Sequence, residues 1–94
     1  MTSLHTLHIL NKTPGHPRSA ACMEALRPGD ALLLTENAVL ALATSGCRGI
    51  NIPVYALMPD VKARGLEQNA GEAALVSYPD MVDLTARAQH IISW

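Results

Sequence analysis

The chain has 94 residues and a formal net charge of −1, with seven Lys and Arg against eight Asp and Glu. The sequence contains no basic stripe that could neutralise phosphates. Its one Trp and two Tyr are too few for a base-stacking platform, so direct nucleic-acid binding is not expected. Hydrophobic residues make up 49% of the sequence and the mean hydropathy is +0.16, so we expect another subunit to cover part of the apolar surface.

The length predicts one domain over residues 1–94. The two cysteines, Cys22 and Cys47, form no CxxC motif and have no metal-ligand partners at zinc spacing, so neither a metal nor a cofactor is predicted. The sequence shows no secretory leader and no transmembrane run. We therefore expect a cytoplasmic protein with reduced thiols and no membrane contact.

The first third of the chain predicts a strand followed by a helix. Residues 4–10 (LHTLHIL) are the strand candidate. Pro17 and Ser19 are typical of a helix start, and residues 20–26 supply an apolar face at helical spacing. The helix is expected to end at residues 28–29, a Pro-Gly pair.

A second strand and helix are predicted directly afterwards. Residues 30–35 (DALLLT) form a continuous apolar run, which is typical of a strand buried on both faces in a parallel sheet. Asn37 is expected to cap the following helix, in which Val39, Leu40 and Leu42 would pack inward.

The remainder of the chain repeats this alternation. Residues 54–58 (VYALM) predict a third strand, and a short helix is expected over residues 59–66. Residues 73–78 (AALVSY) predict a fourth strand, followed by a helix over residues 79–88 and a short final strand over residues 91–94.

Alternating strands and helices predict an α/β fold, a three-layer sandwich with a mainly parallel sheet of four or five strands. Ligands of such sheets bind beyond the carboxyl ends of the strands. In this sequence those ends fall at residues 11–12, 36–37, 59–60 and 79–80. Glu36 and Asn37 are therefore candidates by position, although a carboxylate at a strand end is a weak signal.

Cys22 is the candidate for chemistry. If Ser19 is the N-cap, Cys22 lies in the first turn of its helix, where the dipole favours a thiolate. The alternative is an inert core thiol, since cysteine is among the most buried residues. Cys47, beside Arg48 in a loop, has a weaker claim.

Other chemistries find little support. The four histidines are expected to be structural, because His5 and His8 would point to opposite faces of a strand while His16 and His90 are isolated. Neither GxGxxG nor GxxxxGK[ST] is present to hold a nucleotide, and no GxSxG motif marks a nucleophilic serine.

Several ordered segments together resemble the TusB/DsrH family. They are LHTLHILNKTP at the start, LLLTENAVLAL after Gly29 and Asp30, VYALMPDVKARGL, VSYPDMVDLTA and the final Trp94. The resemblance covers nearly the whole chain. It implies a DsrEFH-like sulfur-relay fold.

The resemblance also implies a function and partners. TusB-like proteins join TusC-like and TusD-like sister subunits in a heterohexamer. This complex passes persulfide sulfur from a TusA-like donor through a TusE-like acceptor toward 2-thiolation of the tRNA wobble uridine. DsrH-like proteins belong to an analogous DsrEFH complex of sulfur oxidation. The principal sulfur-carrying cysteine is expected on the TusD/DsrE-type subunit.

Three hypotheses follow. The first is an accessory subunit of a TusBCD-type relay, not catalytic alone. The second is a DsrH-like subunit in which Cys22 accepts sulfur, because DsrH-like members carry a cysteine that matches it. The third is a stand-alone small-ligand-binding domain. In isolation, a homodimer is expected through the surface that otherwise meets the partners.

Overall fold

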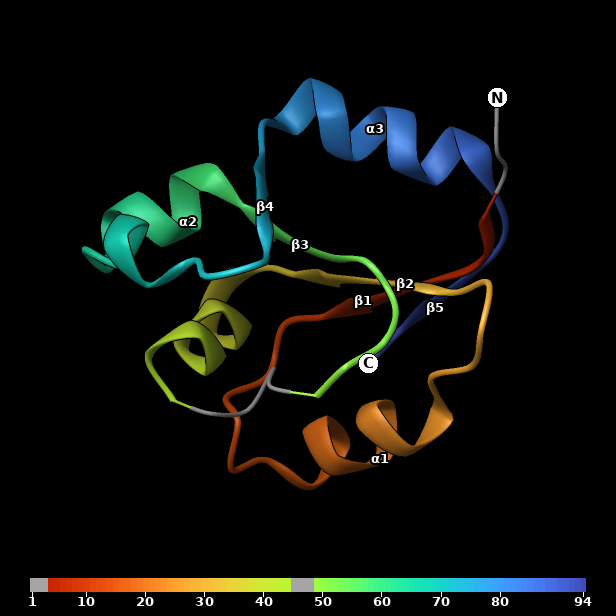
Figure 1. Cartoon of the computed structure of the whole chain (residues 1–94), viewed down its shortest axis with the longest axis horizontal. Coiled ribbons are helices and arrows are strands. Elements are labelled where there is room, and N and C mark those ends of the chain that lie inside the picture. The colour runs from red at the N-terminus through yellow and green to blue at the C-terminus, as the bar shows by residue number, and fades with distance from the viewer. Residues whose placement is uncertain (1–3, 45–48) are drawn as a thin grey trace.

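The computed structural model describes residues 4–44 and 49–94. A five-stranded sheet runs through the middle of the molecule, with α1 and α3 on opposite faces (Figure 1). Every pair of neighbouring strands is parallel. The predicted α/β three-layer class is therefore confirmed, while the organisation of residues 1–94 as one domain stays a prediction.

The elements alternate along the chain as expected. The strands are β1 (Leu4–Leu10), β2 (Ala31–Leu34), β3 (Val54–Leu57), β4 (Ala74–Val76) and β5 (Ala88–Ser93). The helices are α1 (Pro17–Ala25), α2 (Met58–Ala63) and α3 (Tyr78–Arg87), with 3-10 helices η1 (Glu36–Ala43) and η2 (Glu67–Asn69). None of the helices in the described ranges has the length and apolar character needed to cross a bilayer.

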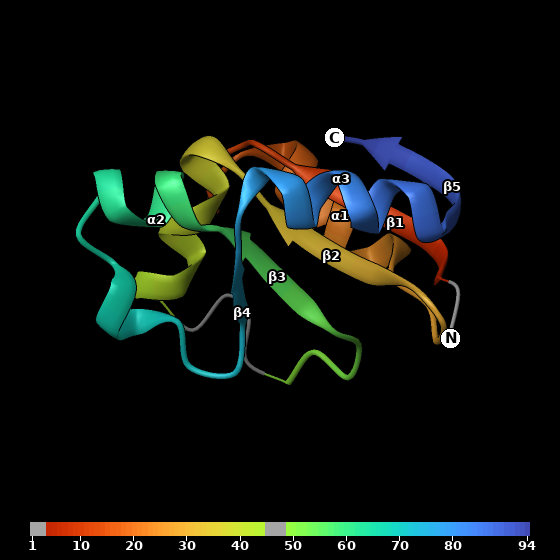
Figure 2. The same cartoon turned by 90° about the horizontal axis from the view of Figure 1, so that it is seen from above.

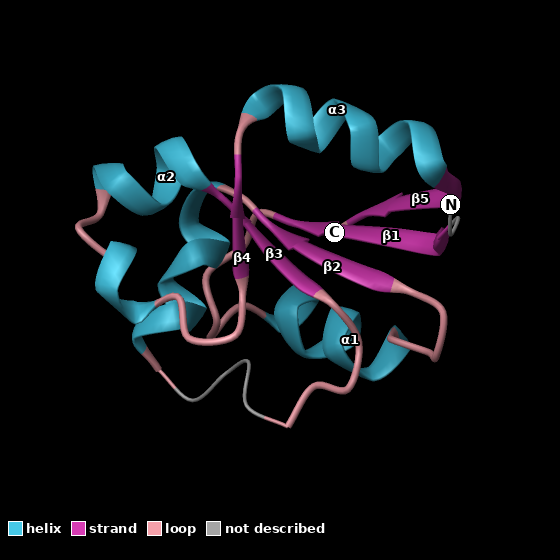
Figure 3. Ribbon diagram, turned by 45° about the horizontal axis from the view of Figure 1, so that its top comes forward, coloured by secondary structure: helices cyan, strands magenta, loops and turns pink. Residues whose placement is uncertain are grey.

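The strand order β4-β3-β2-β1-β5 explains the position of the last helix (Figure 3). The chain moves outward one strand at a time from β1 to β4. It then returns across the sheet through α3, so that β5 pairs with β1. Parallel crossovers are right-handed, so the return connection places α3 on the face opposite α1 and η1 (Figure 2).

The continuous apolar strands supply two cores at once. In β2, Ala31 and Leu33 pack toward α3, whereas Leu32 and Leu34 pack toward α1 and η1. All four side chains are fully buried. This pattern is the one expected for a central strand of a parallel sheet that is covered on both faces.

The start of α1 differs from the prediction that Ser19 is its N-cap. His16 holds that position, and its Nδ1 accepts a hydrogen bond of 3.0 Å from the main-chain N–H of Arg18. Pro17 occupies the first helical position, where its fixed φ and missing N–H cost nothing. The Ser19 hydroxyl instead donates to the Thr13 carbonyl at 2.6 Å.

The helix after β2 also begins differently. Asn37 is not its cap: Thr35 occupies the N-cap position without a capping side-chain bond, and the segment is a 3-10 helix. The Asn37 side chain accepts instead from Arg64. Val39 and Leu42 are buried as expected, whereas Leu40 is only partly buried.

The last helix ends one residue earlier than predicted. Ala88 was expected on its apolar face, but it has extended dihedrals and pairs with Leu4 as the first residue of β5. Pairing with β1 therefore overrides the helical spacing. At the other end, Ser77 and Asp80 form a reciprocal capping box.

We expect Ser77→Ala to lower the free energy of unfolding by about 1 kcal/mol, because the main-chain N–H of Asp80 loses its acceptor. Urea denaturation measures the change. Thr85→Ala, on a partly exposed site of the same helix, serves as the control and should change the value by less than about 0.5 kcal/mol. Equal effects of the two variants would contradict this role of the cap.

Candidate functional site

The carboxyl ends of the strands meet at one edge of the sheet, and the structure brings several polar residues together there. Asn11 and Lys12 follow β1, Glu36 follows β2, and Asp60 lies in the first turn of α2 after β3. Three of the four strand ends that the sequence indicated are thus joined. At the fourth, Asp80 is engaged in the capping box of α3.

Glu36 is the strained residue of this edge. Its φ is +50°, in the left-handed region that costs a non-glycine residue on the order of 1 kcal/mol. The Glu36 N–H donates to Asp60 Oδ2 at 2.7 Å, and Asn11 Nδ2 donates to Glu36 Oε2 at 3.5 Å. These bonds hold the turn between β2 and η1 in its unfavourable conformation.

Two cations lie beside this turn. Lys12 Nζ donates to the Asn11 side-chain oxygen and, at 3.0 Å, to the Trp94 main-chain oxygen. Arg64 donates to Asn37 Oδ1 at 2.9 Å and to the Asp60 main-chain oxygen at 3.1 Å. Within residues 4–44 and 49–94, neither cation forms an ion pair with an Asp or Glu side chain. The sequence did not single out Arg64, because it lies at the end of α2 and is separated from the end of β3 by that whole helix.

This edge can orient a polar or charged group, but it carries no sulfur nucleophile in the described part of the chain. Cys22, the one cysteine described, faces the core instead. In the same part of the chain no group of three or more His, Cys, Asp or Glu side chains is placed to hold a metal ion.

Cys22 does not have the first-turn position that the sequence predicted for it. Because His16 is the N-cap, Cys22 lies in the second turn of α1, and its side chain is fully buried against the core that includes Leu10 and Leu34. Burial raises the pKa of the Cys22 thiol to about 11. This environment favours the neutral thiol over the thiolate. Cys47 lies outside the described residues.

We expect the native protein to resist alkylation of Cys22 at pH 8, where about a thousandth of the thiol is ionised. In a Cys47→Ser background, iodoacetamide labelling followed by mass spectrometry should detect no adduct until denaturant is added. Rapid labelling of the native chain would show that Cys22 reaches solvent.

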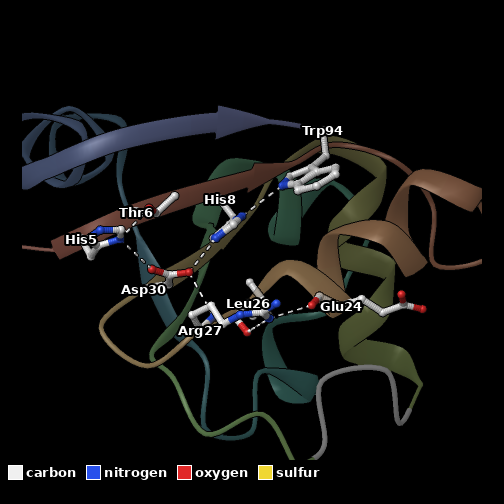
Figure 4. A network of polar contacts seen from close by, with 8 residues as sticks. All are labelled: His5, Thr6, His8, Glu24, Leu26, Arg27, Asp30 and Trp94. Carbon is white, nitrogen blue, oxygen red and sulfur yellow. Dashed lines mark hydrogen bonds and ion pairs between the residues drawn. The ribbon is translucent and has the colours of Figure 1, made fainter.

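A chain of side-chain hydrogen bonds links the residue after β5, the middle of β1 and the residue before β2 (Figure 4). Trp94 Nε1 donates to His8 Nδ1 at 3.1 Å, and His8 Nε2 lies 2.9 Å from Asp30 Oδ2. The indole nitrogen can only donate, so His8 Nδ1 is the acceptor and the proton sits on Nε2, facing the carboxylate. His8 thus has the structural role expected from the sequence, and its two ring nitrogens are both engaged.

Asp30 is the anionic end of this chain. Burial by itself would raise its pKa, but hydrogen bonds from His8 and from the Arg27 N–H outweigh burial and hold the pKa below its ordinary value. Its other oxygen, Oδ1, accepts no hydrogen bond and lies 3.5 Å from His5 Nδ1. Asp30 therefore stabilises the fold as a carboxylate.

The loss of folding stability at acid pH, called the acid limb below, should depend on Asp30. Its pKa is lower when folded, so its contribution is complete above the ordinary pKa and disappears as the pH falls through the folded pKa. We expect Asp30→Asn to be less stable at pH 7 and to lose less further stability below about pH 5 than the wild type does. Urea titrations at stepped pH measure this.

Asp83→Asn is the control, because Asp83 is 68% exposed in an ion pair with Arg87 on α3. It should keep the steep acid limb of the wild type. If Asp30→Asn lost stability with acid as steeply as Asp83→Asn, the buried carboxylate would not control this limb.

A cavity of about 490 Å³ lies at the opposite, amino-terminal edge of the sheet. Its lining comes from the end of η1, the segment before β3 and the loop before β4, and includes Ile50, Ile52, Asn69 and Glu72. It is therefore separate from the carboxyl ends of the strands, where sheets of this kind usually bind ligands.

Comparison with solved structures defines the class of protein. The crystal structure of YchN from Escherichia coli superposes with a TM-score of 0.75 at 14% identity, covering 97% of this chain and 99% of that one. The solution structure of Tm0979 from Thermotoga maritima gives a TM-score of 0.65 at 24% identity, covering 86% and 91%. The chain is thus a small α/β protein, and the predicted DsrEFH-like fold is confirmed.

The sequence comparisons are more specific. Residues 12–91 match the model of the DsrH-like protein family. Protein TusB of Pectobacterium carotovorum is 35% identical over 94 residues, covering 94% of this chain and 99% of the relative. Protein TusB of Escherichia coli K12 has the same identity and coverage. The chain belongs to the TusB/DsrH family.

Proposed function

We propose that this chain is an accessory subunit of a Tus-type sulfur relay that supports 2-thiolation of the tRNA wobble uridine. Full-length similarity to proteins named TusB carries the proposal. Membership of this family implies a role in the thiolation relay and a place in a Tus complex. The more specific proposal is that TusC-like and TusD-like subunits complete a heterohexamer, which exchanges sulfur with TusA-like and TusE-like carriers in the cytoplasm.

The accessory character is supported by the thiol chemistry. A sulfur carrier needs an accessible thiolate, whereas Cys22 is fully buried and has a raised pKa. The carboxyl edge of the sheet offers Lys12 and Arg64, two cations that pair with no Asp or Glu side chain within the described residues. These two cations can bond to a partner subunit or orient a reactive group that the partner presents. The subunit would then contribute surface and position, and a sister subunit would contribute the reactive cysteine.

The second candidate is a DsrH-like subunit with Cys22 as a sulfur acceptor. The match of residues 12–91 to the DsrH-like model favours keeping it. In that case α1 has to move away from the sheet to expose the thiol, because the side chain is buried between them. This role of Cys22 stays a prediction.

Deletion of the gene should abolish or strongly reduce 2-thiouridine in tRNA, measured by mass spectrometry of tRNA nucleosides. The wild-type chain and Cys22→Ala should both restore it, because the relay does not use this thiol. A tagged chain should co-purify with two sister subunits from the same cells.

Two results would contradict the two parts of this proposal separately. Unchanged 2-thiouridine in the deletion strain would contradict a role in thiolation. Restoration by the wild type but not by a folded Cys22→Ala would assign the sulfur-accepting role to Cys22. Circular dichroism and co-purification of the variant establish that it is folded and assembled.

A further inference from the structure

The two edges of the sheet differ in how they are protected. β4 (Ala74–Val76) has only three residues, and very short edge strands are a common protection against unwanted pairing. β5 (Ala88–Ser93) has six residues, AQHIIS, with no Pro, Lys, Arg, Asp or Glu. Proteins usually place such residues on exposed edges, so the β5 edge has the composition of a strand that is paired.

The side chains of β5 support the same conclusion. Ile91 is 48% exposed and Ile92 is 41% exposed. Ile91 is in register with Leu7 and Ile92 with His8, so the two isoleucines point to opposite faces of the sheet. An additional strand along β5 would cover apolar surface on both faces.

The hydrogen bonds of β5 show which main-chain groups are available. The Trp94 N–H donates to the Ile9 carbonyl at 2.9 Å, toward β1. Main-chain groups alternate in direction along a strand, so Gln89, Ile91 and Ser93 turn their N–H and C=O groups outward. No described strand pairs with this side of β5 (Figure 3). Three donors and three acceptors therefore face outward.

We propose that β5 pairs in antiparallel register with β5 of a second copy of this chain, around a two-fold axis at Ile91. In this register Ile91 faces Ile91, Gln89 faces Ser93, and His90 faces Ile92. The Ile91 pair is apolar and the Gln89–Ser93 pair is polar, whereas His90 lies opposite an isoleucine; the two-fold axis repeats the Gln89–Ser93 and His90–Ile92 pairs. The strand carries no charged residue, so self-pairing sets no like charges opposite each other.

The consequence is a continuous ten-stranded sheet across two copies, with α3 of each copy on one face. Ile91 would lie at its centre on the α3 face, since it is in register with Leu7, which packs toward α3. This contact goes beyond the proposed sulfur-relay role and does not depend on it.

Cross-linking tests the register directly. In a background with Cys22→Ala and Cys47→Ala, Ile91→Cys places two thiols on directly opposed residues, whose Cα atoms are about 5.5 Å apart and within disulfide range. Gln89→Cys is the matched control, because its two copies would be about 13 Å apart in the same register. Mild oxidation should yield a covalent dimer with Ile91→Cys and little with Gln89→Cys.

The state of assembly provides the second measurement. The wild-type full chain should be a dimer by light scattering, and Ile91→Lys should weaken dimerisation at least tenfold by setting two lysines opposite each other. Val82→Lys is the control, because Val82 is 62% exposed but lies on α3. It should leave the dimer unchanged.

Three results would overturn the proposal. They are a wild-type monomer at concentrations where small dimers form, equal cross-linking of the two cysteine variants, and loss of the dimer in Val82→Lys but not in folded Ile91→Lys. Pairing of β5 with a different subunit would give the first of these results. None of them bears on the thiolation assay, so the two proposals fail separately.

Discussion

The buried hydrogen-bond chain from Trp94 through His8 to Asp30 is the interaction on which the arrangement of this half of the molecule depends. It links the residue after β5, the middle of β1 and the turn before β2, which are far apart in the sequence. A buried polar group that loses its partner costs about 1–3 kcal/mol, so removing one of these three residues would destabilise the other two. It therefore adds side-chain bonds to the main-chain pairing that holds β5 and β2 beside β1.

The position of β5 has consequences at two places. Where the strand ends, the Trp94 main-chain oxygen accepts from Lys12 and so joins the polar edge that includes Asn11 and Glu36. Along its length, the strand presents an uncharged edge with two exposed isoleucines. Both features suit contact with other subunits. The thiol of Cys22, in contrast, is buried in the core, where it contributes packing rather than reactivity. Part of the apolar surplus of so short a chain is exposed on β5, at Ile91 and Ile92.

The sequence was informative where the structure depends on local pattern. The continuous apolar run in β2 predicted a strand buried on both faces, and Pro and Gly residues marked most of the element boundaries. The caps were less predictable. Ser19 and Asn37 are good capping residues, but Ser19 bonds back to the loop at Thr13 and Asn37 receives Arg64 from another element. Such competition between possible partners depends on the tertiary structure.

The polar chain could not be predicted for a related reason. His8 and Asp30 are 22 residues apart, and Trp94 is 86 residues from His8. No local motif connects them, and only the return of the chain through α3 brings Trp94 to β1. For Cys22, a shift of the helix start from Ser19 to His16 moved the thiol from the first turn to the second, and this changed its expected ionisation. The resemblance to a family, by contrast, depends on order along the whole chain and was not affected by such local errors.

The central claim is that this subunit acts through its surfaces while a sister subunit carries the sulfur. The most direct test is to load the assembled complex with a persulfide donor and to measure the intact mass of every subunit. The account predicts that a mass gain of one sulfur atom appears on a sister subunit and not on this chain. A gain of one sulfur on this chain that disappears in Cys22→Ala would contradict it.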